Sequence, residues 1–534
     1  MIKKYILPIL LLACLIFPVS VFGADIYVDA TPGEDCSGDY NIATRDCGGA
    51  TDGDSYQTID GAVDSGLSAG DTIHIRAGTY TEVVSIGNVS GSSENKITLQ
   101  NYTGESITIA AGTGSAITLY SHAGYWVIGA QSDRSNFNIT ATINGDTKVM
   151  WFEGSDNACQ TTYNCEDHSL YGVYNMTFQN ITMAGKFYFV GQDSTFDNIE
   201  LDGNNQWSNG FYLTWLSTYG NTISNCIVHD YLVRGVELNH VGKSGSPNVI
   251  EKSHIYSLGN DVDKAGAGVD IDGYGDAQGS PYNIVRYNQI HDMGEQGVQL
   301  ENAFYAQIYG NIMYDMVTAS NTAAGIFILA YGDDGLEDAN LSIAIYDNII
   351  FDCDRGIRAW AGEYVTIANN TFYSNNIQDL WLQQDDLAGG HLCDNYTIKN
   401  NIFVEWAAAA SAIWLYGDPT GTVFDNNMFY HSNGDAQQTH DDDSSRYTLA
   451  NWKTAKSAET YDDENSTFAD PKFTNAAGDD FTLLPGSPAR NAGDTSIDAT
   501  RLQPTTTFGT TSNGLTMEDI TIGAYGVYRG AAGM

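Results

Sequence analysis

The sequence predicts an all-β fold built as a solenoid, and three observations support this prediction. Short strand-like segments recur along the chain, Gly and Asn separate them, and the residues that dominate long helices are scarce. The 534 residues include 56 Gly and 10 Pro, and charged residues make up 17%. Coiled coils and helical repeats need Glu, Lys, Leu and Ala in bulk, so this composition excludes them. The 42% of hydrophobic residues also exclude a disordered chain.

The first repeated element is an asparagine, an apolar-rich triplet and then an acidic or small residue, and it recurs at intervals of roughly 22 to 37 residues. It reads NCIVHD (225–230), SHIYSL (253–258), NQIHDM (288–293), NIMYDM (311–316), NIIFDC (348–353), NTFYSN (370–375), NIFVEW (401–406) and NMFYHS (427–432). We expect the asparagine to occupy a sharp turn, because it tolerates left-handed backbone angles. Its side-chain amide is expected to hydrogen-bond to the asparagine of the next coil.

The second repeated element is a strand that begins about ten residues later and reads glycine, apolar, any residue, apolar. It appears as GVEL (235–238), GVDI (268–271), GVQL (297–300), GIFI (325–328), GIRA (356–359) and AIWL (412–415). Each unit is therefore one coil of two or three strands. No coil can bury its apolar side alone, so the coils are expected to stack around a shared core.

The N-terminus carries the pattern of an export signal. Lys3 and Lys4 precede an apolar stretch, and Val21-Phe22-Gly23 offers small residues where a signal peptidase reads. The pattern predicts a signal peptide over 1–23, and hence a secreted protein, extracellular or periplasmic. Leu11-Leu12-Ala13-Cys14 matches a lipoprotein cleavage box less well. No other segment approaches the roughly 20 apolar residues of a membrane span, so no integral membrane segment is expected.

Seven cysteines remain after the signal peptide. Two pairs bracket short loops and are candidates for disulfides in an oxidising compartment. These pairs are Cys36 with Cys47, and Cys159 with Cys165. The other three lie in or near apolar strand-like runs and are expected to be buried thiols: Cys226, Cys353 and Cys393.

The chain is strongly acidic, with a formal net charge of −43 and a pI near 4.2. A nucleic-acid partner is therefore not expected, since polyphosphate is bound by positive surfaces. An anionic membrane face is excluded for the same reason. The expected state is a monomer.

Two blocks of sequence resemble a known superfamily. The N-terminal block reads Tyr27-Val28-Asp29, Tyr56-Gln57-Thr58-Ile59 with Ala62, and Gly70-Asp71-Thr72-Ile73 with Ala77-Gly78-Thr79-Tyr80-Thr81-Glu82. The C-terminal block reads Asp470-Pro471-Lys472-Phe473, Pro485-Gly486-Ser487-Pro488-Ala489, Ala492-Gly493-Asp494 and Ile522-Gly523-Ala524-Tyr525. Together they resemble secreted proteins of the pectate-lyase-like superfamily, notably bacterial polysaccharide lyase families 9 and 6. The resemblance implies a right-handed parallel β-helix.

The expected organisation has four parts. They are a signal peptide (1–23), an N-terminal cap with the first coils (24–110), the main β-helix (111–435) and a C-terminal segment packed on the solenoid (436–534).

The second strands, aligned at their glycines, predict one outward-facing column of residues that we call the strip. Its acidic end contains Glu237, Asp270, Asp272 and Glu301. Its other end contains Arg358, Trp360, Trp381, Trp414 and Tyr416. Clustered carboxylates suit Ca²⁺, which takes 6–8 oxygen ligands, and aromatic faces suit the C–H faces of sugar rings. Two alternatives stay open: outward acids are common in so acidic a chain, and a register shift of one residue would bury the aromatics.

The resemblance implies a calcium-dependent polysaccharide lyase acting on a uronate-containing polysaccharide. Such an enzyme needs a base, which the superfamily often supplies as Lys or Arg. The candidates are Lys243 first and Lys264 second, then Arg234, with His240 beside the acidic end. Each lysine could equally be a surface residue or an ion-pair partner. Elsewhere, His291 stands where other coils have Tyr or Phe and is expected to stack.

The motifs of the two lyase families are matched in part. Glu237 with Lys243-Ser244 and Asn248 resembles a segment of family 6, but the arginine-bearing segment expected after it is not evident. Asp270 and Asp272 match the acidic calcium motif of family 9 by residue type. The Asp-Pro-His motif of β-helix mannuronan epimerases does not occur.

Other functions stay open. An inverting glycoside hydrolase could use Asp270 or Asp272 with Glu301 as its acid and base. An epimerase would use the same fold, and a noncatalytic surface or carbohydrate-binding protein would use the strip for adhesion.

Overall fold

The structure is a computed structural model. It describes residues 23–49, 52–87, 89–112, 115–120, 123–140, 148–153, 173–215, 218–259, 266–273, 280–318, 322–330, 341–383, 393–406, 411–416, 419–434, 439–440, 446–455, 463–490 and 492–494. The predicted signal peptide except its last residue, the Cys159–Cys165 pair and Lys264 lie outside these residues.

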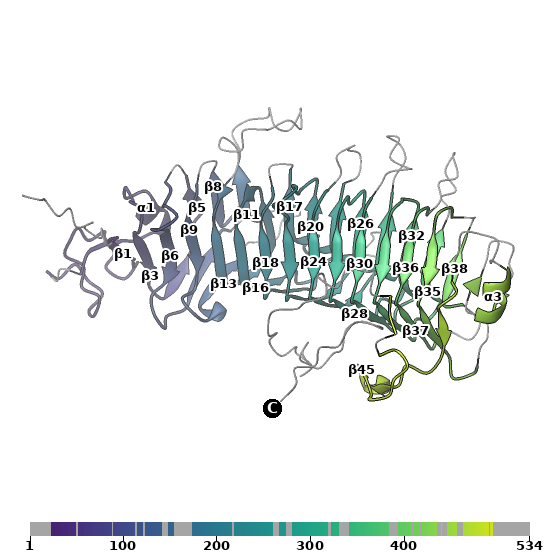
Figure 1. Cartoon of the computed structure of the whole chain (residues 1–534). Coiled ribbons are helices and arrows are strands. Elements are labelled where there is room, and N and C mark those ends of the chain that lie inside the picture. Colours follow the sequence, from purple (N-terminus) through teal and green to yellow (C-terminus); the bar gives the residue numbers. More distant parts are fainter. Residues whose placement is uncertain are drawn as a thin grey trace, which may run out of the picture.

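One sheet of 14 strands runs along the molecule, and we call it the long sheet (Figure 1). Its strands are β5 (Val84–Ile86), β8 (Ile117–Tyr120), β11 (Lys148–Glu153), β14 (Lys186–Phe189), β17 (Asn209–Thr214), β20 (Arg234–Asn239), β23 (Ala267–Asp272), β26 (Gln296–Glu301), β29 (Ala324–Leu329), β32 (Arg355–Trp360), β35 (Gln378–Gln383), β38 (Ile413–Leu415), β41 (Thr439–His440) and β42 (Arg446–Tyr447). Neighbouring strands are parallel except the last pair, β41 and β42. Each strand is supplied by a successive coil.

The remaining coil strands form a second sheet of 27 strands. They are β1 (Asp25–Val28), β2 (Asp54–Tyr56), β3 (Thr72–Ile75), β4 (Gly78–Tyr80), β6 (Ile97–Asn101), β7 (Ile107–Ala110), β9 (Trp126–Gly129), β10 (Phe137–Thr140), β13 (Thr177–Ala184), β16 (Thr195–Asp202), β18 (Thr222–Ser224), β19 (Ile227–His229), β21 (Val249–Glu251), β22 (His254–Leu258), β24 (Ile284–Arg286), β25 (Gln289–Met293), β27 (Gln307–Tyr309), β28 (Ile312–Tyr314), β30 (Ala344–Tyr346), β31 (Ile349–Phe351), β33 (Thr366–Ala368), β34 (Thr371–Tyr373), β36 (Thr397–Lys399), β37 (Ile402–Val404), β39 (Val423–Asp425), β40 (Met428–Tyr430) and β43 (Thr467–Phe468). All its pairings are parallel between coils, which confirms the predicted all-β solenoid.

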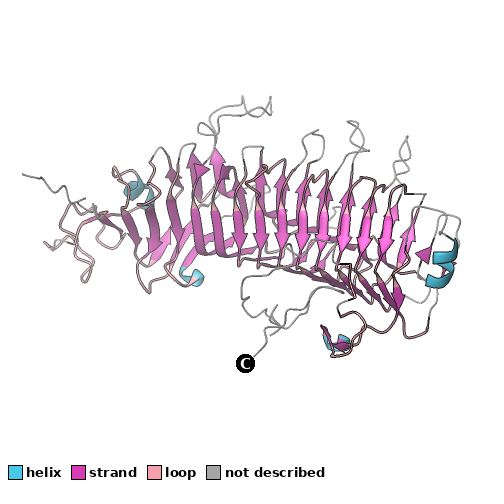
Figure 2. Cartoon of the chain, in the orientation of Figure 1, coloured by secondary structure: helices cyan, strands magenta, loops and turns pink. Residues whose placement is uncertain are grey.

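Helical structure is minor within the described residues, as Figure 2 shows. It consists of α1 (Ile59–Val63), α3 (Leu449–Ala455) and the 3₁₀ turns η1 (Arg134–Asn136) and η3 (Ala476–Gly478). Small additional sheets are β12 (Val173–Tyr174) with β15 (Gly191–Gln192), and β44 (Phe473–Asn475) with β45 (Asp480–Leu483). No helix in this part of the chain is long and apolar enough to cross a bilayer.

The core lies inside the coils, and alternation along each strand fills it. In β23 the side chains of Val269 and Ile271 are fully buried. The position before each such pair must be glycine, because the backbone there lies close to the next coil. A Cβ built on Gly268 would lie 2.6 Å from the Gly297 carbonyl oxygen and 2.6 Å from Ile290 Cγ2. Any side chain there would therefore push neighbouring coils apart.

A ladder of buried asparagines links the coils. In each, Nδ2 donates to Oδ1 of the next asparagine at 3.0–3.1 Å. The same Oδ1 also accepts a hydrogen bond from the backbone N–H of the asparagine one coil before. The ladder consists of Asn288, Asn311, Asn348, Asn370, Asn401 and Asn427, all fully buried. The predicted amide-to-amide bonding is thus confirmed.

Two details of that prediction are wrong. The left-handed backbone belongs to the residue before each ladder asparagine, for example Tyr287 (φ 58°) before Asn288 and Asn400 (φ 59°) before Asn401. The asparagine is selected for its buried amide instead. In the 225–230 segment the ladder position is Cys226, whose N–H donates to Ser253 Oγ at 3.1 Å. Asn225 is the exposed turn residue, so the sequence alignment was shifted by one there.

The ends of the solenoid are closed by separate devices. Cys36 and Cys47 form a disulfide, in a loop that also buries an ion pair between Asp29 and Arg45. The three remaining described thiols are buried, as expected. Near the other end, Phe481 of β45 packs 5.2 Å from the rings of both Phe351 and Tyr373. The segment around β44 and β45 therefore covers part of the second sheet.

One acid replaces the repeated glycine of the long sheet. Asp379 in β35 is completely buried and accepts a hydrogen bond from Asn375 Nδ2 at 2.8 Å. Burial raises its pKa to about 8, although the Asn375 hydrogen bond opposes this rise. Asp379 therefore keeps its proton in the folded state at neutral pH.

We predict that Asp379→Asn reduces the loss of stability on going from pH 5 to pH 9. The folded state keeps the Asp379 proton up to about pH 8, whereas the unfolded state releases it near pH 4. Asp379 therefore costs stability as the pH rises between these two values. Thermal midpoints at the two pH values measure the effect, with Asn expected to raise the midpoint at pH 9 more than at pH 5. Exposed Asp64→Asn is the control. Equal midpoint changes at both pH values would contradict the assignment.

Candidate functional site

The strip occupies the outer face of the long sheet in the predicted register. Glu237 pairs with Asp270, which pairs with Gln299, and the column continues through Phe327, Arg358, Trp381 and Trp414. A second column runs through Asn239, Asp272, Glu301, Leu329, Trp360 and Gln383. Tyr416 directly follows β38 and is exposed. The glycine alignment therefore places every strip residue on the correct face.

A third column was missed by the sequence analysis, because it lies three residues before the first column and is out of phase with strict two-residue alternation. It contains Asn209, Arg234, Ala267, Gln296, Ala324, Arg355 and Gln378. Arg234 and Arg355 are its two basic members, and each stands at one end of the strip.

The acidic end is organised around Arg234. Its Nε contacts the Asp270 carboxylate, and its terminal nitrogen lies 3.8 Å from Glu237 Oε2. Asn209 Nδ2 donates to the same Glu237 oxygen. Asp270 is fully buried and Glu237 is 5% exposed, although both point away from the core. Arg234 is therefore the positive partner that the two innermost acids share.

The charges of this group follow from burial and from one another. Burial raises the pKa of Asp270 well above its usual value, against the opposing effect of Arg234. Burial likewise raises the pKa of Glu237. The pKa of Arg234 is raised, because Asp270 and Glu237 outweigh the opposite effect of burial. Arg234 is thus a permanent cation and a poor general base.

Glu301 differs from the other acids. Burial, and then the charge of Asp272, raise its pKa to about 7. Gln299 Nε2 donates to Glu301 Oε1 at 2.8 Å, which opposes the rise. Glu301 therefore exchanges its proton near neutral pH, as a general acid or base must. Its titration could not be predicted from the sequence, because it depends on how deeply the carboxyl group is covered.

The four predicted calcium ligands do not converge on one point. Among the described residues, only two groups of three His, Cys, Asp or Glu ligand atoms lie within 4.8 Å of one another, and neither group contains a strip acid. Arg234 occupies the position among Glu237 and Asp270 that the sequence analysis assigned to an ion. Asp272 and Glu301, opposite each other on β23 and β26, remain as a possible pair of carboxylate ligands.

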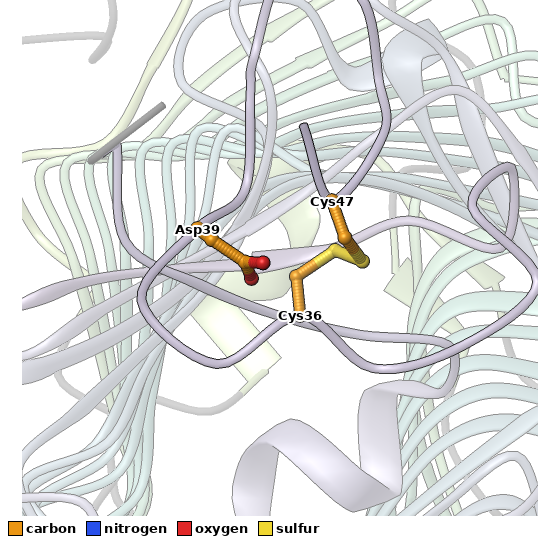
Figure 3. A group of neighbouring side chains, drawn as sticks. All are labelled: Cys36, Asp39 and Cys47. Atoms are coloured by element: carbon orange, nitrogen blue, oxygen red, sulfur yellow. A yellow bond between two sulfur atoms is a disulfide. The ribbon is translucent and has the colours of Figure 1, made fainter. Parts of the chain in front are cut away.

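One of the two groups is Cys36, Asp39 and Cys47 (Figure 3). Its sulfurs are joined in the disulfide and cannot act as thiolate ligands. This group is structural.

The predicted bases lie in different surroundings. Lys243 is exposed on the turn after β20, with Nζ 4.5 Å from the centre of the Tyr219 ring. His240 follows β20 directly, and its Nδ1 lies 2.9 Å from Asn239 Oδ1. The backbone N–H of His240 donates to the Asp272 carbonyl oxygen at 2.8 Å. The structure thus brings His240 to the acidic end of the strip, whereas Lys243 lies against the ring of Tyr219.

The other end of the strip is an arginine held among aromatic rings. The guanidinium carbon of Arg358 lies 4.5 Å from the Trp360 ring, 5.0 Å from Trp381 and 5.1 Å from Phe327. Arg355 lies 4.3 Å from Trp381. The rings of Trp381 and Trp414 stack at 5.1 Å with an interplanar angle of 8°.

Arg358 forms no close ion pair, although the charge of Glu295 acts on it at longer range. In the described part of the chain no carboxylate oxygen lies within 4.0 Å of its nitrogens, and its buried Nε has no hydrogen-bond partner. Burial lowers the pKa of Arg358, and burial with the neighbouring charge of Arg358 lowers that of Arg355 to about 10. Burial is the first cause of both shifts, and the charge of Arg358 adds to it at Arg355, so an anion bound at this end of the strip would be favoured.

Comparison with known proteins adds the handedness of the fold. A family model described as a right handed beta helix region matches residues 278–451. No curated protein matches the chain.

Three solved structures are similar to the chain in outline. A pectate lyase is 14% identical over 90% of this chain and 94% of that one, with a TM-score of 0.38. A family 6 polysaccharide lyase from Pseudopedobacter saltans is 12% identical over 80% and 94%, with a TM-score of 0.43. The A-module of a mannuronan C-5 epimerase from Azotobacter vinelandii is 14% identical over 83% and 100%, with a TM-score of 0.41. None of these likenesses carries an activity over to this chain.

We predict that Asp270→Ala lowers the free energy of unfolding by about 3 kcal/mol or more, because it leaves Arg234 largely buried beside a missing counterion. The double variant Arg234→Met/Asp270→Leu, with Glu237→Gln in both proteins so that this buried carboxyl group is not left without Arg234, is expected to recover most of that loss. Urea denaturation measures both. A double variant no more stable than Asp270→Ala would show that the pair is not coupled in this way.

Proposed function

We propose that the outer face of the long sheet binds a uronate-containing polysaccharide and cleaves it by β-elimination. The observation that carries the proposal is Arg358, which lies among Trp360, Trp381 and Phe327 without a close ion pair in the described part of the chain. A guanidinium group recognises a carboxylate through paired hydrogen bonds. Flat aromatic rings offer large apolar contacts to the C–H faces of sugars. A sugar acid presents both features in one residue.

The length of the strip favours a polymer over a single sugar. Arg234 and Arg358 belong to strands four coils apart, and strands are spaced about 4.8 Å, so the two cations are about 19 Å apart. A chain of several sugar residues laid along the coils would meet positive charge at both ends. The aromatic residues lie at one end, where they would hold the chain beyond the acidic cluster.

The proposed chemistry takes place at the acidic end. A base removes the proton α to the uronate carboxyl group, and its electrons form a C4–C5 double bond. The bond from C4 to the bridging oxygen breaks, and that oxygen takes up a proton. Positive charge beside the carboxylate acidifies the α proton, and Arg234 is the cation at this end.

The residues nearest to Arg234 supply candidates for the two proton transfers. If His240 donates its Nδ1 proton to Asn239 Oδ1, Nε2 is the unprotonated nitrogen and serves as base. Glu301, whose pKa lies at about 7, serves as the proton donor to the leaving oxygen. Asn239 and Glu301 occupy one column two strands apart, about 10 Å, so a sugar residue would fit between base and acid.

Calcium dependence remains a prediction. The donors that fit an ion best are the carboxylates of Asp272 and Glu301, because Glu237 and Asp270 contact Arg234, and an ion bound by Glu301 would compete with the proton that Glu301 donates. A bound Ca²⁺ would supply positive charge to the substrate carboxylate, the same contribution that Arg234 makes. Elimination measured with calcium and with chelator tests the dependence.

A second candidate function is an inverting glycoside hydrolase. It is favoured by one observation, the neighbouring acids Asp272 and Glu301, of which Glu301 is protonated near neutral pH. One acid could protonate the leaving oxygen while the other activates water. Uncharged polysaccharides would then be substrates.

We predict that the protein raises the ultraviolet absorbance of a uronate polymer such as pectate or alginate, since elimination creates a conjugated double bond. His240→Ala is expected to lower kcat by about 100-fold or more, the usual loss on removing a general base. The control is His291→Phe on the second sheet, where neighbouring coils carry Tyr or Phe. Reducing ends without an absorbance change would favour the hydrolase, and binding without either signal would leave a noncatalytic role. If Lys243→Ala lowers kcat and His240→Ala does not, Lys243 is the base.

We predict that Arg358→Ala raises KM about tenfold or more with little change in kcat, because a charge-assisted hydrogen bond contributes about 1.5–3 kcal/mol. Arg286→Ala, which removes an arginine from the second sheet, is the matched control. Steady-state kinetics on polymers of defined length distinguish the two parameters. A fall in kcat alone would place Arg358 at the reaction centre rather than at a binding position.

We predict that kcat falls as pH rises through about 7, because Glu301 then loses the proton that it donates. In Glu301→Gln the remaining activity should lack this descending limb. A pH–rate profile of both proteins is the measurement. An unchanged profile in the variant would assign the proton donor elsewhere.

A further inference from the structure

A second cluster of titratable groups lies away from the strip, on the second sheet. Asp202 ends β16 and His229 ends β19, and the two are paired in register on adjacent coils. Asp230 follows His229 in a left-handed conformation, with φ 58°. Glu200 lies on the same strand as Asp202, two residues earlier, and so faces the same side.

These groups surround the two nitrogens of one imidazole ring. His229 Nδ1 lies 2.8 Å from Asp230 Oδ2 and 3.9 Å from Asp202 Oδ1. His229 Nε2 lies 3.6 Å from Glu200 Oε1. The potential ligand atoms of Asp202, His229 and Asp230 all lie within 4.8 Å of one another.

The ring is held from two sides. It stacks on the Tyr256 ring at 5.1 Å with an interplanar angle of 6°. Glu200 is fixed by Arg134, whose Nε lies 3.1 Å from Glu200 Oε2. The His229 side chain is 12% exposed, whereas Asp202 and Asp230 are 43% and 36% exposed. A rigid nitrogen therefore faces two acids that solvent ions can reach.

The two ring nitrogens of His229 differ in their hydrogen bonding. His229 Nε2 is buried and has no partner within hydrogen-bond distance in the described part of the chain, and its nearest acceptor is Glu200. His229 Nδ1 lies at hydrogen-bond distance from Asp230 Oδ2, so without a metal a proton on Nδ1 joins the two groups. A metal cation that replaces this proton leaves the ring proton on Nε2, where Glu200 is the nearest acceptor.

The turn at His291 can be compared with the turn at His229. His291 is also followed by a left-handed acid, Asp292 (φ 55°), and its Nδ1 lies 2.9 Å from Asp292 Oδ2. The acid after the histidine is therefore a feature of this turn. At His291 the strand before it supplies Tyr256 in the register position that Asp202 holds beside His229. What sets His229 apart is the pair of strand acids, Asp202 and Glu200.

We propose that Asp202, His229 and Asp230 bind a divalent transition-metal ion of the zinc class. The ion would take His229 Nδ1 and one oxygen from each aspartate, with water completing the coordination. At bond lengths of about 2.0–2.2 Å, tetrahedral ligands are about 3.4 Å apart. The observed separations of 2.8 and 3.9 Å lie on either side of this value, so small side-chain rotations are sufficient.

The donor set explains the choice of metal. An imidazole nitrogen with two carboxylates suits Zn²⁺ or Co²⁺, whereas Ca²⁺ prefers oxygen ligands alone. Glu200, anchored by Arg134, is the outer carboxylate that commonly orients a metal-binding histidine through its other nitrogen. The site joins two consecutive coils and is independent of the function proposed for the strip.

The test is titration of the chelator-treated full chain with Co²⁺, followed by its visible absorption, and with Zn²⁺, followed by calorimetry. We expect saturation at one ion per chain, a tetrahedral Co²⁺ spectrum that Zn²⁺ abolishes, and a higher thermal midpoint with Zn²⁺. Asp202→Asn and His229→Gln are each expected to weaken binding by about tenfold or more. Asp292→Asn, which alters the same turn at His291, is the matched control and should bind normally.

The outcomes that overturn the proposal are specific. Failure to saturate, or equal losses in Asp202→Asn and Asp292→Asn, would show that no site exists at His229. Weaker binding in Asp272→Asn with normal binding in Asp202→Asn would assign the ion to the strip instead. Far-ultraviolet circular dichroism checks that each variant is folded, and Asp202→Asn, which alters a partly exposed side chain, remains informative if His229→Gln misfolds.

Discussion

The buried amide ladder is the interaction on which the rest of the structure depends. From Asn288 to Asn401 each side chain donates to the next asparagine, and each asparagine from Asn311 to Asn427 accepts from the backbone N–H of the asparagine one coil before. An amide has one acceptor and two donors, and a fully buried one must satisfy them. Each coil can therefore meet the next in only one register. The apolar core contributes more burial and also disfavours a one-residue slip, and the ladder adds hydrogen bonds that only one register satisfies.

That register decides which residues meet on the outside. Because side chains alternate faces, a slip of one residue would send Arg358 and the tryptophans into the core and the isoleucines to solvent. With the register held, Arg234 meets Asp270 on the next coil, and Arg358 meets rings from the coils on both sides. The same rule on the second sheet aligns Asp202 with His229. Both proposed sites are thus consequences of stacking, built from residues far apart in the chain.

Charge is distributed unevenly in spite of the overall acidity. Two arginines of the long sheet illustrate this: Arg234 is paired with acids, whereas Arg358 has no ion pair within 4.0 Å among the described residues. A buried cation without a partner is costly, so it is retained only where something compensates it or where binding does. The contrast between Arg234 and Arg358 separates the strip into a reactive end and a binding end.

The amino-acid sequence by itself determined the class of fold, the coil boundaries and the outward face of the strip, because two-residue alternation and turn residues are local properties. It also identified the ladder, with an error at Asn225, where Cys226 takes the amide's position. Only the tertiary structure decided that Arg234 lies where an ion was expected, that Glu301 titrates near pH 7, and that Lys243 contacts Tyr219. These outcomes depend on distances between coils and on burial, which are set by residues that the spacing of any single motif does not contain.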